Sequence, residues 1–94
     1  MNCFYPAQTI VEAYADFRKS GIEENSNDPG YTNLRAKLEI GKDVKDTYDY
    51  VAINYEWNGD KTFVVKMFYV GGETDVKFTQ DRNGTRATMI FSPD

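Results

Sequence analysis

Three glycine-containing turn signals divide the second half of this chain into runs of alternating apolar and polar residues. The signals are Asn58-Gly59, Gly71-Gly72 and Asn83-Gly84, and such dipeptides are typical of short β-hairpin loops. Alternation with a period of two is typical of strands that bury one face. The sequence therefore predicts four antiparallel strands, over residues 47–56, 61–70, 74–82 and 85–92.

The lengths of these turns predict which face of the sheet is buried. A three-residue loop with Gly59 in the left-handed conformation, followed by a two-residue turn at each of the other signals, keeps one set of apolar side chains together. In this register Met67 lies opposite Val76, and Phe78 lies opposite Met89. We expect the core to include Leu38, Ile53, Val65, Met67, Phe78 and Met89, and the same alternation assigns Phe91 to it.

The first half of the chain has a helical pattern and a segment with two interpretations. Pro6 suits the first turn of a helix, apolar residues then recur at helical spacing, and Gly21 suits a C-cap. We therefore expect a helix over residues 6–20 and an exposed loop over residues 23–30. Residues 32–40 alternate with a period of two and predict a strand, although their residue types also favour a second helix.

Together these elements predict a single α+β domain over residues 1–94, with one N-terminal helix packed on one face of a five-stranded antiparallel meander. The sequence has no apolar run long enough to span a bilayer and no basic leader followed by an apolar segment. Its single cysteine, Cys3, cannot form an internal disulfide. We therefore expect a cytoplasmic protein with no membrane partner.

The side chains that most enzymes use are missing or isolated. The chain has no histidine, and Cys3 therefore lacks the usual activating base. The glycines do not form a phosphate-binding loop, and Asp43, Asp46 and Asp49 lack the spacing of a calcium-binding loop. We expect a protein that is not an enzyme and has no cofactor or metal ion.

Residues 43–60 carry five carboxylates and one lysine, and their net charge of −4 equals that of the whole chain. A negative surface disfavours direct binding to nucleic acid and favours a protein partner with a basic surface. The candidate contact residues in this segment are Asp46, Asp49, Glu56 and Asp60.

Apolar side chains also occur at outward positions of the predicted strands, on the face opposite the helix. They are Tyr48, Tyr50, Val64, Phe68 and Val70. An apolar patch of this kind is typical of a protein interface, unless a loop or a chain terminus covers it. Adjacent carboxylates again favour a basic partner.

These features favour a small, acidic, non-enzymatic protein-binding module. One specific hypothesis is a phage or mobile-element inhibitor of a host nucleic-acid-binding defence protein, similar in role to an anti-CRISPR protein. Two alternatives stay open: a structural subunit that forms a homodimer or larger homo-oligomer through its apolar face, and a domain that binds a small ligand.

Overall fold

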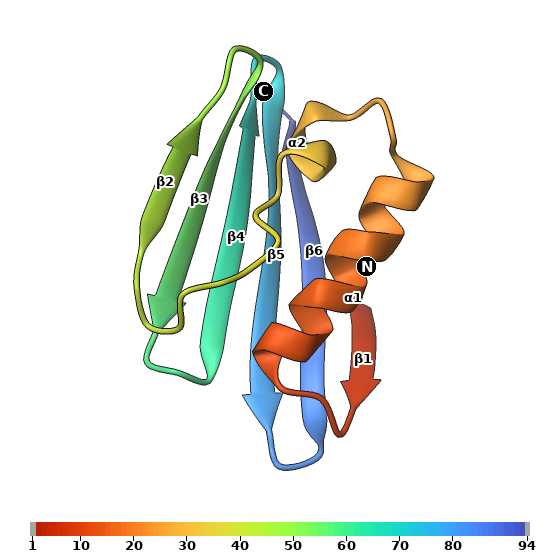
Figure 1. Ribbon diagram of the computed structural model, residues 1–94, viewed down its shortest axis with the longest axis vertical. Helices are drawn as coiled ribbons and strands as arrows, with labels where there is room; N and C mark the ends of the chain where they lie inside the picture. The colour runs from red at the N-terminus through yellow and green to blue at the C-terminus, as the bar shows by residue number, and fades with distance from the viewer. Residues whose placement is uncertain (1, 94) are drawn as a thin grey trace.

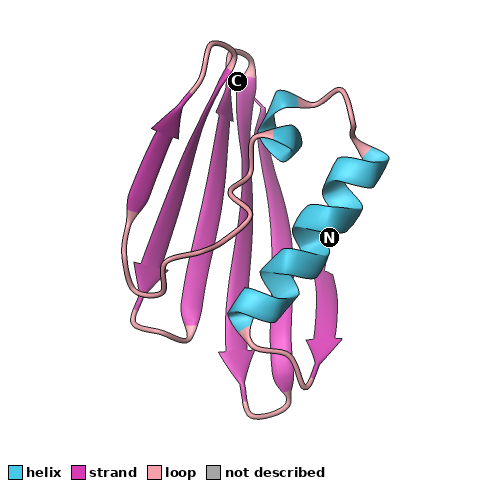
Figure 2. Ribbon diagram, in the orientation of Figure 1, coloured by secondary structure: helices cyan, strands magenta, loops and turns pink. Residues whose placement is uncertain are grey.

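The computed structural model describes residues 2–93 as one antiparallel sheet of six strands with two helices on one face (Figures 1 and 2). The helices are α1 (Ile10–Glu24) and α2 (Pro29–Thr32). The strands are β1 (Asn2–Pro6), β2 (Val44–Thr47), β3 (Val51–Asn58), β4 (Thr62–Tyr69), β5 (Gly72–Asp81) and β6 (Gly84–Pro93). Their order across the sheet is β1-β6-β5-β4-β3-β2. The α+β class is therefore confirmed: four of the five predicted strands correspond to β3–β6, whereas β1, β2 and the short helix α2 were not predicted. No described helix is long and apolar enough to cross a membrane.

The predicted faces of the C-terminal hairpins are confirmed, but two registers differ from the prediction. Ile53 pairs with Met67 and so shares its face as expected, whereas Met67 lies opposite Thr74 and Phe78 opposite Ala87. Each shift is two residues, which preserves the buried face. The turns are residues 70–71 and 82–83, one position earlier than predicted. The positive φ values are at Gly72 and Gly84, the first residues of β5 and β6.

The core lies between α1 and the sheet. Ile53, Val65, Met67 and Phe78 are completely buried, as predicted, whereas Leu38 and Met89 are only partly buried at its margin. Aromatic rings fill the centre, where Tyr14 of α1 meets Phe63 edge-to-face with ring centroids 5.9 Å apart. Such contacts stabilise a core beyond their buried area, and they fix α1 against β4 and β5.

The N-terminal segment corrects the predicted start of the helix. Residues 2–6 form β1, which pairs with β6, and Pro6 ends that strand instead of opening a helix. The helix starts after Thr9, whose hydroxyl accepts from the Glu12 N–H while the Glu12 carboxylate accepts from the Thr9 N–H. This capping box satisfies helix donors. Gly21 is not a C-cap but lies inside α1, where the ring of Tyr31 leaves no room for a Cβ.

Residues 32–40 form neither the predicted strand nor the alternative helix. The single turn of α2 ends at Thr32, and residues 33–43 cross the helix-covered face of the sheet as irregular chain (Figure 1). The Arg35 N–H donates to the Tyr55 hydroxyl at 2.9 Å, and its carbonyl accepts from the Tyr14 hydroxyl at 2.6 Å. Side chains thus satisfy backbone groups that a strand would pair.

The loop predicted over residues 23–30 is also partly structured. Helix α1 continues to Glu24, and α2 begins at Pro29 with Asp28 as its N-cap. Residues 23, 24, 26 and 27 are exposed as predicted, whereas Gly30 is buried and, with the neighbouring Tyr31, packs on the core.

Candidate protein-contact surface

The structure brings together five of the nine contact residues predicted from the sequence. Tyr48, Asp49 and Tyr50 form the turn between β2 and β3, and Phe68 and Val70 lie next to or in the turn between β4 and β5. Both turns are at the same end of the sheet, because Val51 at the start of β3 pairs with Tyr69 at the end of β4. Helix α2 lies at this end too (Figure 1).

The predicted apolar patch on the outer sheet face is not continuous. Tyr48 and Tyr50 lie in a turn rather than along a strand, because β3 begins only at Val51. Val64 and Phe68 are half-buried, and Lys66 stands between them on β4, with its Nζ 3.1 Å from Glu56 Oε1. The middle of the outer face is therefore charged.

The acidic residues of segment 43–60 are dispersed over the molecule. Asp46 faces the helix-covered side, where Arg35 donates to its carboxylate at 2.6 and 2.8 Å; this bidentate contact lowers the pKa of Asp46. Glu56 pairs with Lys66 on the other face. Asp49 and Asp60 are exposed in turns at opposite ends of β3. These carboxylates do not form one acidic surface.

Exposed apolar side chains gather at the end of the sheet next to α2. Val70 is 89% exposed, Tyr50 73%, Phe91 65% and Tyr48 39%. The end of β6 belongs to this region because Pro93 pairs with Gly72, which in turn pairs with Tyr69. We call this region the α2-end surface and define it by Tyr48, Asp49, Tyr50, Phe68, Val70, Phe91 and Pro93.

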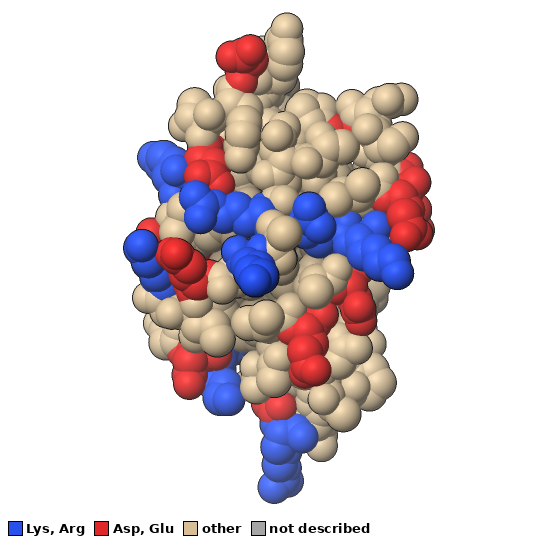
Figure 3. Space-filling model, viewed as in Figure 1, with Lys and Arg blue, Asp and Glu red and all other residues tan. Residues whose placement is uncertain are grey.

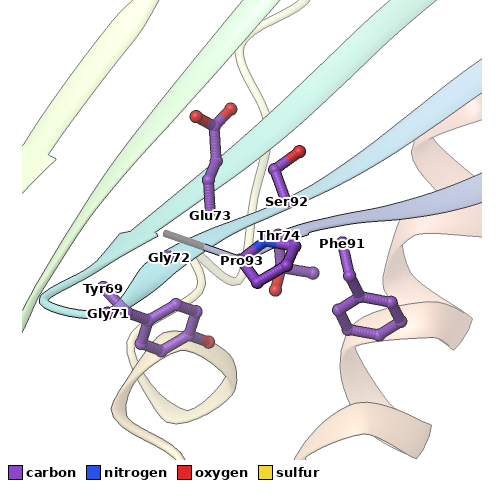
Figure 4. Close-up of a pocket in the computed structure, with 8 residues that line it drawn as sticks. All are labelled: Tyr69, Gly71, Gly72, Glu73, Thr74, Phe91, Ser92 and Pro93. Carbon is purple, nitrogen blue, oxygen red and sulfur yellow. The ribbon is translucent and has the colours of Figure 1, made fainter.

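A depression of about 380 Å³ opens on the helix-covered side of this surface. The rings of Tyr69 and Phe91 point to the same side of the sheet with Pro93 between them, whereas Glu73 points to the opposite side (Figure 4). Gly72 has no side chain and lies between Tyr69 and Pro93 in the register, which leaves the floor open. The depression is therefore mainly aromatic and apolar.

Carboxylates surround the α2-end surface. The depressions at this end have four acidic residues in their walls, Glu24, Asp28, Asp49 and Glu73, and none of the described residues that line them is Lys or Arg. Figure 3 shows Lys and Arg side chains across the middle of the helix-covered face, while its upper end consists mainly of uncharged residues with a few acidic side chains. This end thus combines apolar area with negative charge.

Two of the groups around this surface have raised pKa values. Burial and a 2.8 Å hydrogen bond to Asp28 raise the pKa of Tyr69, so its hydroxyl stays protonated and joins β4 to the N-cap of α2. A hydrogen bond with Asp75 raises the pKa of Glu73. The Tyr69–Asp28 contact holds one wall of the depression in place.

The described residues contain no cluster of three or more acidic or sulfur ligands that could hold a metal ion. Cys3 is exposed on β1.

Sequence reasoning missed Phe91 because the alternating pattern assigned it to the core. It does face the helix-covered side, but the described part of β1 ends opposite Thr88 and leaves Phe91 without a neighbouring strand there. A β6 of ten residues beside a β1 of five is the feature that exposes it. This difference in length between β1 and β6 matters only because the two strands pair, and local sequence patterns do not reveal a pairing over so many residues.

No protein-family model matches this sequence, and no curated protein or solved structure is significantly similar to the chain.

Proposed function

We propose that this protein is a non-enzymatic module that binds another protein through its α2-end surface, and that the partner presents Lys or Arg there. The observation that carries the proposal is the combination of highly exposed Tyr50, Val70 and Phe91 with a rim of carboxylates.

Apolar area at exposed turns favours association because its burial contributes roughly 25 cal/mol per Å². Tyrosine is common at interface centres, since it offers a large rigid surface with a polar tip. The carboxylates add selectivity for a basic surface through electrostatic complementarity. A cationic side chain also fits the depression, because the ring faces of Tyr69 and Phe91 attract cations.

A nucleic-acid-binding protein is one partner class with the required basic surface. The narrower hypothesis of a phage or mobile-element inhibitor of a host defence protein rests on the small size of the chain and its net charge of −4. Since the acidic residues of segment 43–60 are dispersed, we assign the contact to the α2-end surface and not to that segment as a whole.

The proposal is tested by affinity capture from lysates of candidate host bacteria, followed by binding measurements with the captured protein. Truncating a central interface aromatic commonly costs about 2 kcal/mol, so Tyr50→Ala is expected to weaken binding more than tenfold. Val70→Ala is expected to weaken binding as well.

Ile40→Ala is the matched control, because Ile40 is 63% exposed but lies near Trp57 and Lys61, away from the α2 end. It is expected to bind like the wild type. If Ile40→Ala reduces binding while Tyr50→Ala and Val70→Ala do not, the assigned surface is wrong. All three variants are expected to unfold at the same urea concentration as the wild type.

A further inference from the structure

The last four described residues of β6 have no strand beside them on the β1 side. Described β1 pairs with Gly84–Thr88 of β6, from Pro6 opposite Gly84 to Asn2 opposite Thr88. Strand β6 continues to Pro93 and pairs with β5 along its whole length on the other side. Within residues 2–93, Ile90–Pro93 therefore pair with β5 on one side and form an open sheet edge on the other.

The pairing pattern reveals which backbone groups point to this edge. The Ala7 N–H donates to the Asn83 carbonyl at 2.9 Å, so alternate residues counted from Asn83 direct their backbone groups toward β1. The Gln80 N–H donates to the Lys61 carbonyl at 2.9 Å, so the even-numbered residues of β5 bond toward β4 and the odd-numbered ones toward β6. Through the β5–β6 register, the odd-numbered residues of β6 then point toward β1, in agreement with the Ala7 contact. Both N–H and C=O of Phe91 thus point outward, as does the C=O of Pro93.

This edge differs from the other two open edges of the sheet. Strand β2 has four residues and carries Lys45, and β1 ends in Pro6; short strands, lysine and proline all discourage strand addition. At the end of β6, by contrast, apolar side chains are exposed on both faces, with Ile90 on the outer face and Phe91 on the helix-covered face.

We propose that an extended segment of the partner adds to Ile90–Pro93 as an antiparallel strand, and this rests on the proposed function. A residue opposite Phe91 would exchange both backbone hydrogen bonds with it, as in other cases of strand addition. Because the described part of β1 already pairs with Gly84–Thr88, the added strand would pair with Ile90–Pro93 alone.

The side chains around the edge define the chemistry of this segment. Next to Phe91, on the helix-covered face, an apolar side chain fits best. On the outer face, Glu73 pairs with Ser92 and Asp75 pairs with Ile90, so a residue opposite Ser92 or Ile90 would be two strands, or about 10 Å, from a carboxylate. Long Lys and Arg side chains span that distance. The partner segment that fits this edge thus alternates apolar and basic residues. A second copy of this chain fits poorly, because it would bring the same carboxylates to the edge.

The first test uses the wild-type protein and the peptide Ac-Val-Lys-Val-Lys-Val-Lys-NH2, followed by ¹⁵N NMR. The peptide is expected to shift the amide signals of residues 90–92 and to slow hydrogen exchange at the Phe91 amide. The same peptide with N-methyl groups on alternate residues cannot complete the backbone pairing and is expected to bind about tenfold more weakly. Equal binding of the two peptides, or signal shifts that exclude residues 90–92, would overturn the proposal.

The second test compares Phe91→Pro with Phe91→Val. Proline removes the outward N–H and leaves the ladder to β5 intact, whereas valine keeps that N–H and removes the ring. Phe91→Pro is expected to weaken peptide binding more than Phe91→Val, and Phe4→Pro on the β1 edge is expected to have no effect. Equal affinities for the two Phe91 variants would contradict strand addition.

Measurements with a captured partner separate this inference from the proposed function. A partner that is lost with Tyr50→Ala but binds Phe91→Pro and Phe91→Val equally supports the α2-end surface and overturns strand addition. Concentration-dependent dimers that Phe91→Pro abolishes would identify a second copy as the occupant, and would also overturn the proposal.

Discussion

Two buried tyrosine hydroxyls determine the path of the chain at a single residue, Arg35. Tyr14 donates to its carbonyl and Tyr55 accepts from its N–H. The Arg35 side chain is thereby presented to Asp46, and its guanidinium lies 5.9 Å from the ring centroid of Tyr55. One residue thus links α1, β2 and β3 through its backbone and its side chain.

Tyr55→Phe is expected to lower the free energy of unfolding by about 1–3 kcal/mol, because the Arg35 N–H then lacks its partner inside the protein. Urea unfolding measures the change. The control is Tyr31→Phe, because the hydroxyl of this buried tyrosine makes only a long contact to the Met89 Sδ, at 4.0 Å, within the described residues. Equal losses in the two variants would contradict a specific role for the contact to Arg35.

At the scale of elements, the hairpins that join β3 to β6 were predictable, whereas the local pairing of β2 with β3 and the long-range pairing of β1 with β6 were not. Alternation and glycine turns were sufficient to find β3–β6 and their buried face. Segment 32–40 has the same alternation but lies on the core as irregular chain, because the hydroxyls of Tyr14 and Tyr55 replace strand pairing. Strand β1 has no local signal; its partner is about 80 residues away in the sequence.

For the candidate contact surface, the sequence predicted several of the exposed residues but not how they are arranged. Tyr48, Tyr50 and Val70 were identified as outward and apolar, and they are exposed. Their arrangement was missed because they lie in turns, where the strand alternation no longer defines a face. Phe91 was missed for a different reason, since its exposure depends on which residues of β6 pair with the described part of β1.

The close approach of β1 to β6 predicts a strong difference between two glycines. Gly84 has φ 144°, and a Cβ there would collide with the Tyr5 carbonyl oxygen, so Gly84→Ala is expected to cost about 2 kcal/mol or more. Gly71 has open space around it, and Gly71→Ala is expected to be nearly neutral. Thermal unfolding measures both variants. Similar melting temperatures for the two would contradict this packing of β1.

At the scale of the whole molecule, several buried tyrosines make stability sensitive to alkaline pH. Burial raises the pKa values of Tyr14, Tyr55 and Tyr69 above the usual value. Below about pH 10 both states keep these protons, so stability is unaffected; above it the unfolded state releases them first and is favoured.

Each such tyrosine is expected to steepen the loss of stability by up to about 1.4 kcal/mol per pH unit above pH 10. Urea unfolding at several pH values measures the slope. Tyr14→Phe is expected to reduce it. A wild-type protein that is as stable at about pH 11 as at about pH 8 would contradict the prediction.

The two exposed turn aspartates predict a directional effect of charge on association. Asp49 lies at the α2 end and Asp60 at the other end of β3, about 26 Å away for eight residues of strand. Because charges are screened over about 8 Å at physiological ionic strength, Asp49→Asn is expected to slow association with a basic partner more than Asp60→Asn does. Stopped-flow measurements at two salt concentrations test this. Equal effects would argue against orientation through the α2 end.

The pairing of the first strand with the last also has a consequence for the order of folding during synthesis. Neighbouring hairpins from β2 to β6 can form as they leave the ribosome, whereas β1 has to wait until residues 84–88 emerge. Contacts between residues so distant in sequence form slowly, because bringing them together closes a long loop at a cost in chain entropy. The residues of β1, although made before their partners in β6, are thus expected to be among the last of this sheet to pair.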